Sequence, residues 1–185
     1  GPPPRRAAAQ PAHAMSSLIA TFRELCQFRR GPQDLPYAPR LLAALVLASL
    51  LARTSAGQLF ATPEAPVSPL RAALATLFVL ALLHTLLSLR RFANRFVQTA
   101  LAWSGLDLIF LALSLPLLLG MGKPPTSPEA MTPAQLVLMW PLLALMIWKL
   151  AVQVHVLRQA LEVRLAAAIL IALLVDLGVS VVFGA

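Results

Sequence analysis

Runs of about twenty apolar residues recur along this chain, and they limit its fold more than any other feature. The clearest run, Leu70–Leu89, is interrupted only by Arg71 near one end and His84 near the other. A helix needs about 20 mostly apolar residues to cross a bilayer. The pattern predicts an all-α, polytopic membrane bundle with five transmembrane helices, at about 41–60, 70–89, 97–121, 134–156 and 165–183.

The composition supports the same class of protein. The chain is 59% hydrophobic and 12% charged, with a mean hydropathy of +0.79, whereas an ordinary globular protein is roughly 45–50% apolar and about 25% charged. Since five spans take up most of these 185 residues, we expect no soluble catalytic domain among them. The first span is the weakest of the five, because Arg53 interrupts it after only twelve apolar residues.

The N-terminal part of the chain is predicted to lie outside the membrane-spanning region. We interpret residues 1–14 as a tag remnant or disordered extension, and residues 15–40 as a cytoplasmic amphipathic segment followed by a Pro-rich connector. Apolar residues at helical spacing from residue 18 to residue 28 favour a short amphipathic helix on the membrane surface. An ordinary helix packed on the ends of the others is the alternative. The residues expected to contact the membrane surface or a docked partner are Phe22, Leu25, Phe28, Arg29 and Arg30.

The positive charge of the chain indicates its orientation. The formal net charge is +8, but the basic residues are scattered between apolar runs and form no patch for nucleic acid. Cytoplasmic flanks of membrane helices retain Lys and Arg. Nine arginines flank one set of helix ends, against three basic residues on the other side: Arg53, Arg71 and Lys123. We therefore expect a multi-pass protein of the bacterial inner membrane, with its N-terminus in the cytoplasm and its C-terminus in the periplasm.

Several ionisable residues fall inside the predicted spans, where an unpaired charge costs about 2.5–3.5 kcal/mol on insertion scales. Asp107 and Lys149 have similar predicted depths, which favours an ion pair that His84 joins by a hydrogen bond. Snorkelling of Lys149 towards the headgroups is the alternative. Arg53 and Asp176 are expected to bridge the first and last spans, unless Arg53 snorkels outward or Asp176 is protonated or faces water as a proton or cation site.

The sequence contains no phosphate-binding glycine loop, His/Glu metal motif or nucleophile elbow. We therefore expect no enzymatic activity, no catalytic residue, no cofactor and no metal. The single cysteine, Cys26, excludes an intrachain disulfide.

A scaffold or assembly factor for a membrane complex fits these observations best. Its expected partners are the lipid bilayer and another membrane protein or a second copy of this chain, and no nucleic acid. The alternative is a small transporter or channel subunit that uses Asp107, Lys149 and Asp176 as ion or proton sites.

Two short stretches add a family resemblance. They are the entry to the first span, Asp34-Leu35-Pro36-Tyr37-Ala38-Pro39, and the sequence Ile147-Trp148-Lys149-Leu150 followed by His155 and Arg158. Together with the five spans and the N-terminal amphipathic segment, they resemble the Yip (Ypt-interacting protein) superfamily, especially its prokaryotic members. The Ala-, Leu- and Arg-rich composition suggests a bacterium with a GC-rich genome. There the resemblance implies an inner-membrane protein without a defined activity.

The predicted topology can be tested with a reporter enzyme that is active only outside the cytoplasm. We expect a fusion after Ala185 to be active, because five crossings place that end opposite the arginine-flanked end. A fusion that is well expressed but inactive would contradict the five-span topology.

Overall fold

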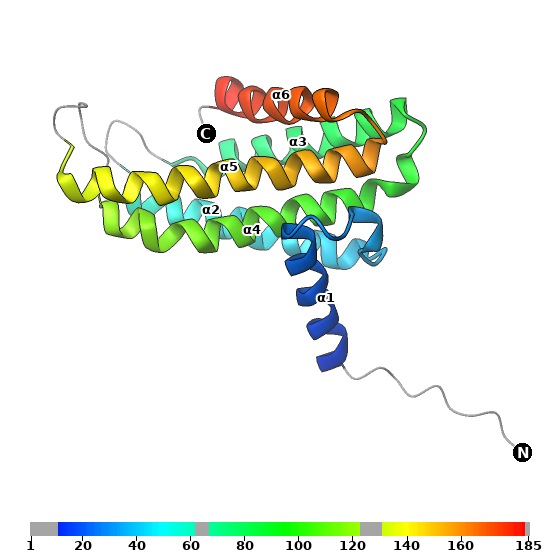
Figure 1. Ribbon diagram of the computed structural model, residues 1–185, viewed down its shortest axis with the longest axis horizontal. Coiled ribbons are helices and arrows are strands. Elements are labelled where there is room, and N and C mark those ends of the chain that lie inside the picture. The colour runs from blue at the N-terminus through cyan, green and yellow to red at the C-terminus, as the bar shows by residue number, and fades with distance from the viewer. Residues whose placement is uncertain (1–10, 62–66, 123–130, 184–185) are drawn as a thin grey trace, which may run out of the picture.

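The computed structural model describes residues 11–61, 67–122 and 131–183, and it confirms the all-α membrane bundle. Five helices are long and apolar enough to cross a membrane, and they alternate in direction along the bundle (Figure 1). A shorter helix, α1, precedes them, and two 3₁₀ turns, η1 (Pro32–Asp34) and η2 (Ala93–Arg95), precede α2 and α4. The elements are α1 (Pro11–Cys26), α2 (Pro39–Phe60), α3 (Pro69–Leu89), α4 (Phe96–Met121), α5 (Pro133–Leu161) and α6 (Leu165–Phe183).

Proline and capping residues set three of the helix starts. Pro39, Pro69 and Pro133 each lie in the first turn of their helix, where the missing N–H group removes no hydrogen bond. The hydroxyl of Thr132 accepts a hydrogen bond from the backbone N–H of Gln135, whose side chain accepts one from the N–H of Thr132. This capping box satisfies two backbone donors that the first turn of α5 leaves without helical partners.

Helix α4 forms the centre of the bundle. It packs against α2, α3 and α5, while α6 packs against α3 and α5 (Figure 1). The first half of α4 is buried almost throughout, and four of its buried residues are small: Ala100, Ala102, Ser104 and Gly105. Small residues let helix backbones approach closely in a membrane, where packing and polar contacts replace the hydrophobic effect as the driving force.

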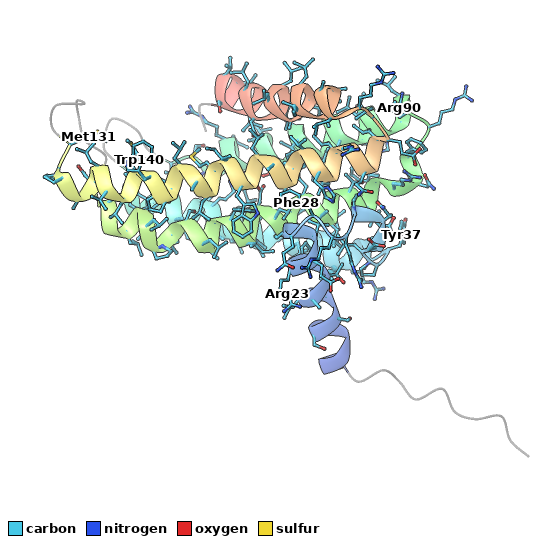
Figure 2. The ribbon with its side chains drawn as sticks, viewed as in Figure 1. Arg23, Phe28, Tyr37, Arg90, Met131 and Trp140 are labelled. Carbon is cyan, nitrogen blue, oxygen red and sulfur yellow. The ribbon has the colours of Figure 1, made fainter. Side chains whose placement is uncertain are left out.

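The outer surface of the bundle is apolar, as expected for a protein with lipid as its solvent. Large side chains on every spanning helix are exposed, among them Leu51, Leu77 and Leu174. Figure 2 places Tyr37 near one end of the bundle and Trp140 towards the other, and both rings are well exposed, at 68% and 69%. Exposed aromatic rings at two levels are typical of side chains at the two membrane–water interfaces.

Helix α5 continues to Leu161, five residues beyond the predicted end of the fourth span. Its 29 residues make it about 43 Å long, which exceeds a hydrocarbon core of about 30 Å. The last two turns carry His155, Arg158 and Gln159. We define the arginine-rich end as the end where α2, α4 and α6 begin and α3 and α5 end; it carries Arg40, Arg90, Arg91, Arg95, Arg158 and Arg164.

Helix α1 begins at Pro11, inside the segment that the sequence assigned to an extension, and residues 1–10 lie outside the described residues. It projects sideways from the bundle, across the long axis of the spanning helices (Figure 1). Phe22 and Leu25 are only 8% and 0% exposed, and they pack in a cluster with Leu101, Leu106 and Val156. This placement corrects the assignment of Phe22 and Leu25 to the membrane surface or a partner, because these side chains bind α1 to the bundle.

The contact between α1 and α4 depends on Gly105. A Cβ atom added at this position would lie 2.3 Å from the ring of Phe22, so a larger residue forces the ring to move. We expect Gly105→Val to undock α1 and to increase protease cleavage between Ser16 and Arg30.

Gly178→Val is the matched control for this substitution. The nearest atom to an added Cβ at Gly178 is 3.4 Å away, an ordinary contact with Phe78. Equal protease resistance in wild type and the Gly105→Val variant would show that the Phe22 contact does not hold α1.

Candidate functional site

Four ionisable residues lie at a similar level inside the bundle. Asp107 is eleven residues from the start of α4, Asp176 eleven from the start of α6, Arg53 fourteen from the start of α2, and Lys149 twelve from the end of α5. At a rise of about 1.5 Å per residue, all four lie about 16–21 Å from the arginine-rich end. Each comes from a different helix. Charges from four of the five spanning helices therefore share one layer.

Asp107 is the centre of this layer. Its Oδ1 atom lies 2.8 Å from Nζ of Lys149, and its Oδ2 atom lies 3.8 Å from Nη1 of Arg53. The Asp107 side chain is 15% exposed, while Lys149 and Arg53 are about one-third exposed. One carboxylate thus connects α2, α4 and α5 through two cations.

The structure brings Asp107 and Lys149 together as the sequence suggested, but it places His84 elsewhere. The His84 ring is exposed and makes an edge-to-face contact with Phe96, with 5.1 Å between ring centroids. His84 lies near the end of α3, and no hydrogen bond to Asp107 or Lys149 is recorded for it within the described ranges.

The expected bridge between Arg53 and Asp176 is replaced by the contact between Arg53 and Asp107. The recorded ion pairs of the described residues include no pair between Arg53 and Asp176. The reason is the order of the helices, because α2 packs against α3 and α4, whereas α6 packs against α3 and α5. The first and last spans therefore do not form the close pair that the bridge required.

Asp176 instead lines a cavity of about 270 Å³ at the level of the charge layer. Arg53, Asp107 and Lys149 also line this cavity, together with Gln153, Trp103 and Ser180. Gln153 is 2% exposed, and its Oε1 atom has no hydrogen-bond partner in the part of the chain that the structure describes. A buried amide oxygen normally accepts a hydrogen bond. This cavity is therefore suited to hold a water molecule or another hydrogen-bond donor, or a cation, next to the Gln153 oxygen.

Sequence reasoning missed Gln153, although a signal for it was present. Gln153 follows Lys149 by four residues, and this spacing places both on the same face of a helix. Trp103 precedes Asp107 by the same four residues on α4. Polar and aromatic residues one turn from a charged residue within a span were therefore candidates for the same site.

A larger and mostly apolar cavity of about 440 Å³ lies against the same three charges. Arg53, Asp107 and Lys149 line it, together with Phe110, Ser114, Leu118 and Leu142 of α4 and α5. The ion pairs thus lie where a polar cavity and an apolar cavity meet.

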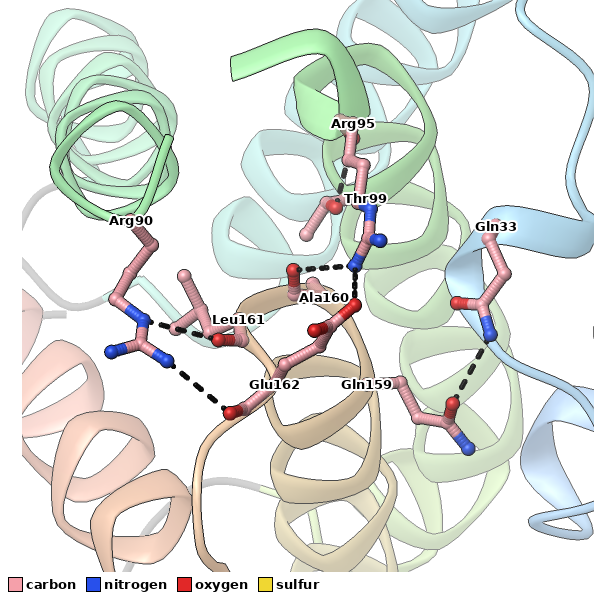
Figure 3. A network of polar contacts seen from close by, with 8 residues as sticks. All are labelled: Gln33, Arg90, Arg95, Thr99, Gln159, Ala160, Leu161 and Glu162. Carbon is pink, nitrogen blue, oxygen red and sulfur yellow. Dashed lines mark hydrogen bonds and ion pairs between the residues drawn. The ribbon is translucent and has the colours of Figure 1, made fainter. Parts of the chain in front are cut away.

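A second polar network holds the arginine-rich end together (Figure 3). Arg90 donates from Nε to the carbonyl of Leu161 at 3.2 Å and from Nη2 to that of Glu162 at 3.3 Å. Arg95 Nη1 contacts the carbonyl of Ala160 and lies 2.7 Å from Oε1 of Glu162. These guanidinium groups satisfy the last carbonyls of α5 and counter the negative end of its dipole.

The connector between α1 and α2 wraps around the same end. Gln98 of α4 donates to the carbonyls of Gln33 and Leu35, at 3.2 and 2.7 Å, and the side chain of Gln33 donates to that of Gln159 at 3.1 Å (Figure 3).

Trp148 donates from Nε1 to the carbonyl of Cys26 at 3.1 Å. Burial raises the pKa of the Cys26 thiol above its usual range, which keeps this thiol protonated and unreactive.

Three of the residues proposed for membrane or partner contact are exposed. Phe28, Arg29 and Arg30 are exposed where α1 ends. Arg30 also forms an ion pair with Glu24. No group of three or more His, Cys, Asp or Glu side chains in the described ranges is placed to hold a metal ion.

The chain matches no family model, no curated protein and no solved structure. The resemblance to the Yip superfamily stays a prediction.

The charge layer predicts a particular order of stability among variants. We expect Asp107→Asn to be the most destabilising single change, because it leaves both Lys149 and Arg53 without a counter-ion, and a charge inside hydrocarbon costs about 2.5–3.5 kcal/mol. Lys149→Met should destabilise the protein less than Asp107→Asn does, since Arg53 still neutralises Asp107. The measurement is thermal unfolding of the purified protein in detergent.

The double variant, Asp107→Asn with Lys149→Met, should be more stable than Asp107→Asn alone because it removes one stranded cation. A double variant whose loss equals the sum of the two single losses would show that the pair contributes no coupling energy.

Proposed function

We propose that this protein is a non-enzymatic scaffold or assembly factor for a membrane complex. The observation that carries the proposal is the neutralisation of Asp107 by Lys149 and Arg53. Polar contacts between membrane helices favour their association, and a fixed arrangement of helices is what a scaffold requires. The five apolar helices themselves support only the broader statement that the chain is an integral membrane protein.

The surface that would bind a partner lies on α1 and the residues after it. Phe22 and Leu25 hold the inner face of this helix, whereas Ile19 is 64% exposed and Arg23 is exposed on its outer face. A helix fixed on one side and exposed on the other is suited to dock another membrane protein or a second copy of this chain. The proposal places this helix on the cytoplasmic side of a bacterial inner membrane, since the arginines collect at that end.

The alternative function is a small transporter or channel subunit, and the polar cavity favours it. Asp176 lines this cavity beside the unpartnered Oε1 atom of Gln153, and no ion pair is recorded for Asp176 in the described part of the chain. A carboxylate next to a polar cavity inside the membrane is a typical proton or cation site.

Two measurements on the same purified protein separate these functions. The first is proton flux in proteoliposomes under a membrane potential, in wild type and in Asp176→Asn. The scaffold proposal expects no flux above that of empty liposomes. Flux that wild type supports and Asp176→Asn abolishes, at equal abundance, would replace the scaffold by the transporter.

The second measurement is photo-crosslinking in cells with a reactive residue in place of Arg23, and in place of Leu174 as the matched control. Leu174 is 55% exposed on α6, where we expect lipid. The scaffold proposal expects a discrete protein adduct from position 23 and none from position 174. The same adducts from both positions, or none from either, would contradict docking through α1.

A further inference from the structure

A polar pocket of about 430 Å³ opens at the arginine-rich end, between the connector, the start of α4 and the end of α5. Its lining includes Gln33, Arg95, His155, Arg158, Gln159 and Glu162. Arg95 is already paired with Glu162 at 2.7 Å. Arg158 is exposed, and no ion pair or hydrogen bond is recorded for it among the described residues. The pocket therefore presents one cation without a counter-ion.

A separate apolar groove of about 450 Å³ lies next to this pocket, along α5 and α6. Its walls are Ile147, Leu150 and Val154 of α5 and Leu165 and Ile169 of α6, and Phe28 also lines it. His155 and Arg158 line both the pocket and the groove, so the two spaces meet at these side chains. From Arg158 to Ile147 the groove covers eleven residues of helix, or about 16 Å, which is close to half the thickness of the hydrocarbon core.

The neighbouring contacts remove an obstacle to an anion in the pocket. The end of a helix carries a partial negative charge that would repel one. Here the last two carbonyls of α5, those of Ala160 and Leu161, and the carbonyl of the following Glu162 are already bound by Arg90 and Arg95 (Figure 3). The positive charge of Arg158 consequently remains available for another group.

Phe28 is held beside the pocket in an unfavourable backbone conformation. Its φ angle is 61°, a left-handed value at a helix end where glycine is usual, and the N–H of Arg29 closes the turn on the carbonyl of Glu24 at 2.9 Å. The Phe28 ring lies edge-to-face on His155, with 5.5 Å between centroids. His155 in turn donates from Nε2 to the carbonyl of Arg30 at 2.9 Å. These contacts fix the boundary between pocket and groove.

We propose that the pocket and groove bind one acidic phospholipid, with its phosphate at Arg158 and one acyl chain between α5 and α6. A water-soluble anion would bind Arg158 but would leave the apolar groove empty. A zwitterionic lipid would carry its own positive group beside Arg158, at an electrostatic cost. A basic pocket that shares Arg158 with an adjoining apolar groove of one leaflet's depth matches an acidic lipid in both charge and length.

The experiment measures lipid binding to the purified full chain in detergent by native mass spectrometry, with phosphatidylglycerol and phosphatidylcholine as probes. We expect one phosphatidylglycerol to remain bound and phosphatidylcholine to bind more weakly. Arg158→Gln should weaken phosphatidylglycerol binding about five-fold, the factor that one basic residue near a membrane surface supplies. Arg164→Gln is the matched control, because Arg164 is exposed at the same end and lines neither space.

A second variant tests the groove without changing the charge. Ala151 lines the groove and is exposed, so Ala151→Phe should fill it and weaken binding of the diacyl lipid. Glycerol phosphate, which has the anion but no acyl chain, should not displace the bound lipid. Equal binding of both lipids, equal losses for Arg158→Gln and Arg164→Gln, unchanged binding by Ala151→Phe, or displacement by glycerol phosphate would each overturn the proposal.

Discussion

The hydrocarbon of a bilayer offers no hydrogen-bond partners, so every polar group that enters it must find its partner within the protein. In this chain the requirement applies to Asp107, whose side chain is 15% exposed and whose carboxylate lies between Lys149 and Arg53. One acidic residue on the central helix therefore determines which faces of α2 and α5 turn towards it. Asp176 and Gln153 line a neighbouring cavity together with this trio.

The central position of α4 follows from a second constraint, which is the size of its side chains. Ala100, Ala102, Ser104 and Gly105 are all buried, and they allow neighbouring helices to approach the α4 backbone. Gly105 also leaves room for the ring of Phe22, so the segment that binds α1 is the same segment that packs the bundle. The position of α1 and the packing of the spans are consequently linked through one glycine.

At the arginine-rich end, hydrogen bonds to backbone carbonyls and one ion pair hold the helices together. Arg90 and Arg95 satisfy the carbonyls at the end of α5, and the left-handed conformation of Glu162 directs the chain into α6. A left-handed residue other than glycine costs about 1–2 kcal/mol, and the ion pair between Arg95 and Glu162 contributes against that cost. This end combines a polar network with Arg158, for which no ion pair is recorded among the described residues, a combination suited to contact with the membrane surface.

The sequence by itself determined the five spans and the similar depth of Asp107 and Lys149, because apolar length and helical rise are local properties of the chain. It also indicated a short amphipathic helix before the first span. Only the tertiary structure decided which way the Phe22 face of that helix points, that His84 stays outside the charge layer, and that Arg53 contacts Asp107 rather than Asp176. The physical reason is that periodicity and depth fix where a residue lies along its own helix. The side-by-side order of the helices comes instead from packing between residues far apart in sequence, and it selects the residue that each charge meets.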